Sequence, residues 1–167
     1  MGARAHGRAR VAPASSPFIA SRVGRRPMEN QLAWDDPLPN PMKTPAMCPC
    51  NSSLAYEACC GRLHAGEAAP NAEMLMRSRY SAFTLCNEAY LLATWHRSTR
   101  PASVAFDPQQ KWLGLKIVDA RVTGGNTAEV EFIARYRVGG GSAARHHERS
   151  RFVLEGERWF YVDGDVR

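Results

Sequence analysis

A chain of 167 residues is long enough for one domain with a buried core, and 44% apolar and 23% charged residues are typical of globular proteins. No stretch approaches the roughly 20 apolar residues of a membrane-spanning helix, so we expect a cytoplasmic protein with no membrane contact. The net charge of +6 is concentrated in residues 1–46, which hold seven basic and three acidic residues, whereas residues 47–167 hold fifteen and thirteen. The nearly neutral body makes nucleic acid an unexpected partner.

Residues 1–46 show no sign of regular structure. Their first part is rich in Arg, Ala and Ser and has no acidic residue before Glu29, a composition that overlaps organelle targeting peptides. A disordered extension is the simpler interpretation, as is a start codon placed too early, with Met28, Met42 or Met47 as the later start. Prolines at positions 37, 39, 41 and 45 then favour an extended linker. We predict a disordered extension and Pro-rich linker over residues 1–46, with residues 1–41 removed by limited proteolysis.

Four of the five cysteines fall within the thirteen residues CPCNSSLAYEACC, at Cys48, Cys50, Cys59 and Cys60. Four thiolates complete a tetrahedral set for Zn²⁺ and leave no position for water, so such a site is structural. Disulfides, a redox dithiol and an iron–sulfur cluster are alternatives. Disulfides need an oxidising compartment, and the other two usually show different spacings. We predict a zinc knuckle over residues 47–62.

Inside the knuckle, residues 52–58 have the length for about a turn and a half of helix. Ser52 or Ser53 is the expected cap of this helix, and Gly61 is its expected end. Zinc binding would supply folding energy that so short a segment cannot obtain by burial. We expect the rest of the protein to stay folded without zinc, because it has a core of its own.

Two helices are expected after a connector that spans residues 61–70. Asn71 follows a proline and is the expected N-cap of a helix over residues 71–85. Its apolar stripe is Met76, Tyr80 and Phe83, flanked by Leu75 and Arg79. Asn87 starts a second helix that buries Leu91, Leu92 and Trp95. The lone Cys86 between the helices is more simply a small core residue than a nucleophile.

After residue 110 the apolar period changes from 3.6 to 2. Residues 127–138 alternate apolar and charged side chains, as a half-buried antiparallel strand does. Residues 112–122, 146–156 and 158–164 predict three more strands, and glycine-containing turns separate the four. Helices followed by a four-stranded meander define an α+β fold, with the helices on one face of a curved sheet.

The spacing C-x-C-x8-C-C resembles the SEC-C motif, and the chain from Cys48 to Gly164 resembles the YchJ-like family. The segments WLGL, FIARYR, ERSRF and RWFYVDG carry the later part of this resemblance, in the right order. It implies zinc on the four clustered cysteines. It also implies a nuclear transport factor 2-like (NTF2-like) cone, a curved sheet closed by N-terminal helices, over residues 63–167. It implies no particular reaction. Family motifs often read CPCGSG; Asn51, Ser52 and Ser53 replace the glycines here, and we expect the turn to survive because Asn and Ser tolerate turns.

Folds of this cone type enclose a pocket, and nine side chains are candidates to line it: Arg77, Tyr80, Trp95, His96, Arg135, Glu148, Ser150, Trp159 and Asp163. His96 is a possible general base, although a polar side chain that caps the helix end is the simpler interpretation. Glu148 and Ser150 share one face of a strand. With Arg77 or Arg135, Glu148 forms either a ligand site or a buried ion pair that only orders the core. We expect some of the aromatic side chains, including Tyr161, to converge with His96 and Glu148 on one concave site.

The charged tripeptide RSR occurs at residues 77–79 and 149–151, and we interpret both copies as solvated charge beside core positions. No nucleophile elbow, phosphate loop or H-E-x-x-H pattern is present. Two functions remain. The first is a zinc-binding, non-catalytic module whose knuckle docks a protein partner. The second is a small-molecule binder or an enzyme of the isomerase, dehydratase or hydrolase type. The first is favoured because the one strong chemical signal is a structural metal site.

Overall fold

The computed structural model describes residues 45–167, so the predictions for residues 1–44 lie outside the described part of the chain. The chain begins with a cysteine-containing loop and then forms helices and strands in two separate runs. The helical run is η1 (Glu57–Gly61), α1 (Arg62–His64), α2 (Ala72–Thr84) and α3 (Glu88–Ala93). The strand run is β1 (Gln110–Gly124), β2 (Thr127–Val138), β3 (Ala144–Glu155) and β4 (Arg158–Val166).

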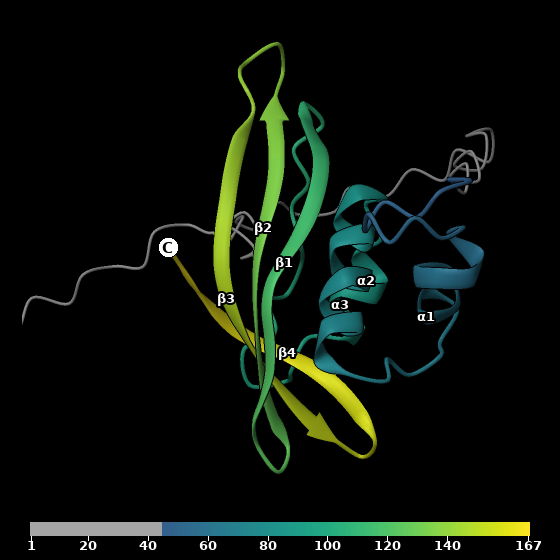
Figure 1. The fold of residues 1–167 in the computed structure, drawn as a ribbon, viewed down its shortest axis with the longest axis vertical. Helices are drawn as coiled ribbons and strands as arrows, with labels where there is room; N and C mark the ends of the chain where they lie inside the picture. Colours follow the sequence, from purple (N-terminus) through teal and green to yellow (C-terminus); the bar gives the residue numbers. More distant parts are fainter. Residues whose placement is uncertain (1–44) are drawn as a thin grey trace, which may run out of the picture.

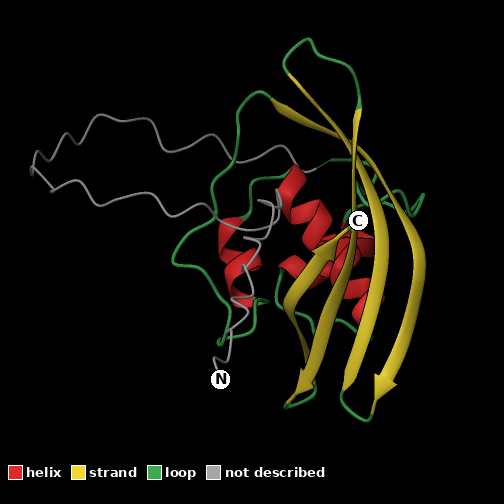
Figure 2. Cartoon of the chain, turned by 90° about the vertical axis from the view of Figure 1, so that its left-hand side faces the viewer, coloured by secondary structure: helices red, strands yellow, loops and turns green. Residues whose placement is uncertain are grey.

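The four strands form one antiparallel sheet in the order β1-β2-β3-β4. The sheet is long and curved, and the helices lie together on one of its faces (Figures 1 and 2). The predicted α+β fold, with helices packed on one face of a four-stranded meander, is confirmed. β2 has the predicted bounds, whereas β1, β3 and β4 are longer than or shifted from their predicted ranges; β4, for example, continues through Gly164 to Val166.

Both main helices begin where the sequence predicts. The Asn71 side chain accepts a hydrogen bond from the Met74 N–H at 2.8 Å, and the Asn87 side chain accepts one from the Tyr90 N–H at 3.1 Å. These bonds satisfy amide groups that have no partner within a helix. Asparagine therefore fixes the start of α2 and of α3.

The two faces of the sheet differ in chemistry. On the face that the helices cover, β2 and β3 bury alternate side chains: Ala128, Val130, Phe132, Ala134, His146, Glu148, Ser150 and Phe152. On the outer face, part of the sheet carries ion pairs, among them Arg149 with Glu131 and Arg151 with Asp163. The two arginines of the second RSR segment thus lie on the charged outer face, beside the buried Ser150, as predicted.

The first RSR segment differs from its prediction. Ser78 is fully buried beside Tyr90 of α3, and Arg79 is only 1% exposed, because Arg79 faces the sheet together with the apolar stripe of α2. Helical spacing accounts for this position, since Arg79 lies three and four residues from Met76 and Phe83. Arg79 is therefore part of the core and not a solvated charge.

The cysteine loop forms its helix later than predicted. Residues 51–54 make bends, Ala55 forms a bridge with Met47, and η1 begins at Glu57. Ser52 does not cap a helix, and Gly61 does not end one, because α1 continues directly from it. Gly61 has a different role: a Cβ atom there would lie 2.8 Å from the Tyr56 carbonyl oxygen, which accepts the Gly61 N–H at 2.7 Å. The glycine permits this close approach.

Candidate functional site

The four clustered cysteines place their sulfur atoms together. All four side chains are buried, all are free thiols, and their Sγ atoms lie within 4.8 Å of one another. The Cys50–Cys59 and Cys59–Cys60 Sγ pairs are 3.6 Å and 3.9 Å apart. In a tetrahedral site with Zn–S bonds of about 2.3 Å, neighbouring sulfurs are roughly 3.8 Å apart. The donor atoms and their spacing therefore fit one tetrahedral metal ion.

The loop backbone explains how two pairs of cysteines reach one point. Asn51 and Ser53 have φ values of 62° and 61°, so the chain reverses directly after Cys50. On the other side, Cys59 has non-helical backbone angles inside η1. Such irregular turns within helices are frequent at functional sites. The expectation that Asn and Ser preserve the turn is confirmed by their left-handed conformations.

Hydroxyl groups and one arginine attach the loop to its surroundings. Ser52 Oγ lies 3.2 Å from Cys59 Sγ, and Ser81 Oγ of α2 lies 3.7 Å from Cys48 Sγ. Arg77 donates to the Cys50 carbonyl oxygen at 3.2 Å and to Glu73 at 2.8 Å. The sulfurs belong to the same buried core as the side chains of α2 and the sheet. The loop is thus packed against the rest of the protein, contrary to the expectation that the rest has a separate core.

A hydrogen-bond chain lies beside the cysteine loop. His64 Nε2 donates to the Ser78 carbonyl oxygen at 2.9 Å, which leaves Nδ1 to accept from the Tyr56 hydroxyl at 2.7 Å. The Ser78 hydroxyl also bonds the Tyr90 hydroxyl at 2.7 Å. Burial lowers the pKa of His64 and raises that of Tyr56 and of Tyr90. The chain links η1 and α1 to α2 and α3, while burial favours the neutral form of His64.

A second buried group of polar side chains lies between the helices and the sheet; we call it the inner polar cluster. It consists of Arg79, Trp95, Glu148, Ser150 and Tyr161. The Glu148 carboxylate accepts hydrogen bonds from Ser150 at 2.7 Å and Tyr161 at 3.2 Å, and His146 Nε2 lies 2.8 Å from its other oxygen. Glu148 is therefore held by several partners, and the prediction that it shares a strand face with Ser150 is confirmed.

Arg79 lies at the centre of this cluster. It donates to the Leu91 carbonyl oxygen and to Thr94 Oγ1, both at 2.8 Å. Its guanidinium carbon lies 4.5 Å from the centre of the Tyr161 ring and 4.9 Å from that of Trp95, a cation–π arrangement. Burial lowers the pKa of Arg79 to about 10, while Tyr161, Tyr90 and Glu148 oppose this shift. Burial, and then the nearby Glu148 charge, raise the pKa of Tyr161. Arg79 thus stays charged and Tyr161 neutral near pH 7.

The predicted convergence of His96 and Glu148 on one concave site is wrong. His96 lies near the surface, where its ring nitrogens contact Ser98 at 2.6 Å and Glu155 at 3.2 Å. Glu148 is 1% exposed and points into the core. The basic side chains near Glu148 are His146 and Arg79, in place of the predicted Arg77 or Arg135.

The other predicted pocket residues are dispersed. Tyr80 is buried against Trp112, with ring centres 5.6 Å apart, and burial raises its pKa to about 12. Asp163 pairs with Arg151 on the outer face, where Arg135 is also exposed. Trp159 lines a separate hollow between α1, α3 and β4. Of the nine candidates, the inner polar cluster brings together only Trp95, Glu148 and Ser150.

Sequence reasoning missed Arg79 and His146 as members or neighbours of this cluster. One signal was available for Glu148: Gly164 stands inside β4, and a Cβ atom there would lie 2.1 Å from Glu148 Oε1. Glycine inside a strand often marks a close approach. Here the approaching group is the Glu148 carboxylate, since Ser150, its neighbour on the same strand face, pairs with Gly164 across the sheet.

The fold and the cysteine site together define a class of protein: an NTF2-like α+β domain preceded by a four-cysteine SEC-C loop. The family model described as YchJ, middle NTF2-like domain, matches residues 71–164, and the SEC-C motif matches residues 46–62. The chain belongs to the YchJ-like family. No helix within residues 45–167 has the length and apolar character needed to cross a membrane.

Relatives and a solved structure agree with this family. A UPF0225 protein of Xanthomonas campestris is 57% identical over 118 residues, which cover 70% of this chain and 92% of the relative. A UPF0225 protein of Methylibium petroleiphilum is 53% identical over 132 residues, which cover 77% of this chain and 95% of the relative. The solution structure of a SEC-C motif containing protein from Rhodopseudomonas palustris matches with a TM-score of 0.64 at 35% sequence identity. The match covers 72% of this chain and 98% of that protein. The cysteine cluster and the motif suggest metal binding.

Proposed function

We propose that the protein is a zinc-stabilised, non-catalytic interaction module whose cysteine loop docks a protein partner. The observation that carries this proposal is the closed set of four buried sulfurs, Cys48, Cys50, Cys59 and Cys60. Four thiolates saturate tetrahedral Zn²⁺, so the ion would serve to fold the loop and would have no position for a substrate. Deprotonated thiolates would hold the ion, and Ser52 and Ser81 lie close enough to two sulfurs to orient them.

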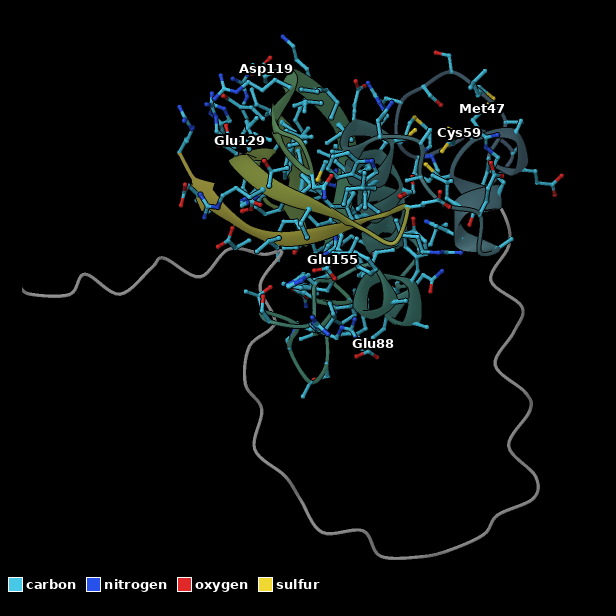
Figure 3. The ribbon with its side chains drawn as sticks, turned by 90° about the horizontal axis from the view of Figure 1, so that it is seen from below. Met47, Cys59, Glu88, Asp119, Glu129 and Glu155 are labelled. Carbon is cyan, nitrogen blue, oxygen red and sulfur yellow. The ribbon has the colours of Figure 1, made fainter. Side chains whose placement is uncertain are left out.

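The surface of the loop supports a docking role. Met47 and Leu54 are 58% and 52% exposed, although large apolar side chains are usually buried. Both belong to the cysteine loop, and Met47 pairs with Ala55, the residue after Leu54. Figure 3 shows Met47 beside Cys59, on the side of the molecule away from Asp119 and Glu129. A metal ion would hold these two side chains in a fixed position for a partner.

The interior of the cone supports a non-catalytic role. Arg79, Glu148 and Tyr161 bond to or stack on one another and on core neighbours. A catalytic acid or base must instead reach a reacting group on a substrate. The inner polar cluster therefore has the chemistry of a group that orders the core.

Elemental analysis of the full-length protein tests the metal. We expect about one zinc per chain, since one tetrahedral ion uses all four thiolates. Cys59→Ser should lose the zinc, whereas Cys86→Ser should keep it, because Cys86 is exposed and outside the cluster. Metal-free protein with all four cysteines paired as disulfides would contradict the proposal.

A quantitative pull-down tests the docking role. Leu54→Glu should release a partner that the wild-type protein retains, and Cys59→Ser should release the same partner. Val122→Glu is the matched control, because Val122 is 71% exposed on β1, far along the chain from the loop. A partner that both glutamate variants lose to the same extent would show that the loop is not the docking site.

A small-molecule binder is the second candidate, favoured by the hollow between α1, α3 and β4. Its volume is about 310 Å³, and Leu63, Tyr90, Trp159 and Phe160 are among its lining residues. This volume is at the lower limit of ligand pockets. Native mass spectrometry of the purified protein after incubation with a metabolite library tests this function. A bound mass that Trp159→Ala abolishes would support it over the non-catalytic module.

A further inference from the structure

The outer face of the sheet is divided into two halves of different charge. Toward one end, cross-strand neighbours have opposite charges: Glu131 pairs with Arg149, and Glu129 pairs with Arg121 and Arg149. This end is electrostatically satisfied by its own side chains. It therefore offers little net charge to a partner.

The other half of the outer face holds only basic charge. Arg135 lies on β2. Its partner on β3 is Arg145, and its partner on β1 is Gly114. In the next row, Lys116 of β1 lies opposite Ile133. Within residues 45–167, Lys116, Arg135 and Arg145 form no ion pair. Like charges directly opposite on neighbouring strands destabilise a sheet, so this arrangement has an electrostatic cost that an anion would relieve.

These basic side chains surround a hollow of about 380 Å³. Leu113 and Ile133 give the hollow an apolar lining, and Leu113 is 41% exposed. Asn51 of the cysteine loop completes the hollow, because its side chain lies over Gly114, where a Cβ atom would be 3.1 Å from the Asn51 amide nitrogen. The hollow is thus continuous with the loop that we propose as a docking element.

We propose that this basic surface, formed by Asn51, Leu113, Lys116, Ile133, Arg135 and Arg145, binds an acidic segment of a protein partner. The inference rests on the proposed function and names the chemistry of the partner. Carboxylates of the segment pair with Arg135, Arg145 and Lys116, and an apolar side chain of the segment enters the hollow. Arginine suits this role because its guanidinium binds carboxylates with two hydrogen bonds.

The surface fits an acidic peptide better than a nucleic acid. Non-specific binding of single strands combines a basic groove with aromatic side chains on which bases stack. The lining here is aliphatic at Leu113 and Ile133, and the ion-paired half of the face begins at Asp119 and Glu131. A short basic region with an aliphatic hollow matches a segment that alternates acidic and apolar residues.

Fluorescence anisotropy with the zinc-loaded full-length protein tests the inference. The probe is a labelled synthetic peptide of alternating glutamate pairs and leucines, and the same peptide with glutamine in place of glutamate is its control. We expect the glutamate peptide to bind and the glutamine peptide to bind at least roughly tenfold more weakly, since the charges provide the attraction. Added salt should weaken the glutamate complex.

Arg135→Glu should weaken peptide binding at least roughly tenfold, because it replaces an attractive contact with a repulsive one. Arg97→Glu makes the same change of net charge at an exposed loop position and should leave the affinity within about twofold. Equal affinities of the two variants would overturn the inference. So would tighter binding of a labelled poly-uridine RNA that depends on Arg135, which would identify a nucleic acid as the partner.

The failure of this inference is distinguishable from failure of the proposed function. Zinc content and the Leu54→Glu pull-down test the cysteine loop, and neither measurement uses Arg135. Amide chemical shifts measured during a titration with the glutamate peptide locate the contact directly. Shifts at residues 114–116, 133–135 and 145 support the inference, and shifts confined to the loop around Leu54 overturn it.

Discussion

The cysteine loop and the inner polar cluster are both buried groups of reactive or charged side chains, but they are held in different ways. The loop brings four sulfurs within 4.8 Å of one another, and their short separations suit a shared ion. In the inner polar cluster, Glu148 and Tyr161 already satisfy each other through a hydrogen bond. We therefore expect the loop to depend on an external ligand, whereas the cluster depends on the fold itself.

This difference predicts opposite responses to mutation. Removing a sulfur ligand should change metal content and stability together. Removing a member of the inner polar cluster should change stability alone, because a buried partner is left without its hydrogen bond.

Cys59→Ser should have the largest effect. Zinc contributes roughly 10–16 kcal/mol to the folding of zinc-finger peptides, which is comparable to the roughly 5–15 kcal/mol that holds a typical domain folded. Because the cysteines share one buried core with α2 and the sheet, loss of the ion should weaken the whole chain. We expect the thermal unfolding transition of this variant to broaden and shift to much lower temperature. Circular dichroism checks this.

The control for that experiment is Cys86→Ser, which should melt like the wild type because Cys86 is exposed. If Cys59→Ser loses its zinc but keeps the wild-type melting temperature, the loop is energetically independent of the cone. That result would restore the expectation from sequence that the cone folds without the metal.

Glu148→Ala should have the next largest effect, a loss of roughly 3–5 kcal/mol of unfolding free energy, because it leaves buried charge and donors without a partner. Ser150, Tyr161 and His146 all contact the carboxylate. Glu148→Gln should cost less, since an amide keeps the size and one acceptor oxygen. Urea denaturation measures both variants, and zinc content should remain that of the wild type. A Glu148→Ala variant as stable as the wild type would show that the carboxylate does not order the core.

Gly164→Ala should destabilise the protein by about 1–3 kcal/mol, the usual cost of overpacking a core. The added Cβ would lie 2.1 Å from Glu148 Oε1, so the carboxylate would have to leave its position. Gly140→Ala is the matched control, because nothing lies within 4 Å of its added Cβ. If the two substitutions cost the same in urea denaturation, the close packing of Glu148 on β4 is not a constraint.

Separation along the chain decides which of these features sequence alone could predict. The four clustered cysteines follow one another within thirteen residues, so their spacing is visible without a structure. The helices and strands were predictable for the same reason, because caps and periodicity are local. Asn71 and Asn87, for example, cap helices that begin at the next residue.

The inner polar cluster was not predictable, because its members come from α2, the end of α3, β3 and β4. Helical spacing places Arg79 on the buried face, but an arginine at such a position usually reaches solvent. Only the fold provides the Trp95 and Tyr161 rings that enclose it. In the same way, His96 and Glu148 share no local pattern, and their predicted convergence failed.

The smallest expected effect concerns the loop backbone. Ser53 has a φ of 61°, a left-handed conformation that costs a residue with a Cβ atom roughly 1–2 kcal/mol and costs glycine little. Ser53→Gly should therefore stabilise the folded protein by about 0.5–1 kcal/mol, which is the relief of strain minus the greater entropic cost of folding a glycine.

Ser52→Gly is the control, and it should destabilise the protein, because the Ser52 hydroxyl lies 3.2 Å from Cys59 Sγ. Chemical denaturation of the zinc-loaded protein distinguishes the two. If Ser53→Gly gains nothing while zinc is bound, the metal alone sets the stability of the loop and its backbone strain is irrelevant. If it gains stability as expected, the loop is held jointly by its ligand and by its turn residues, unlike the inner polar cluster.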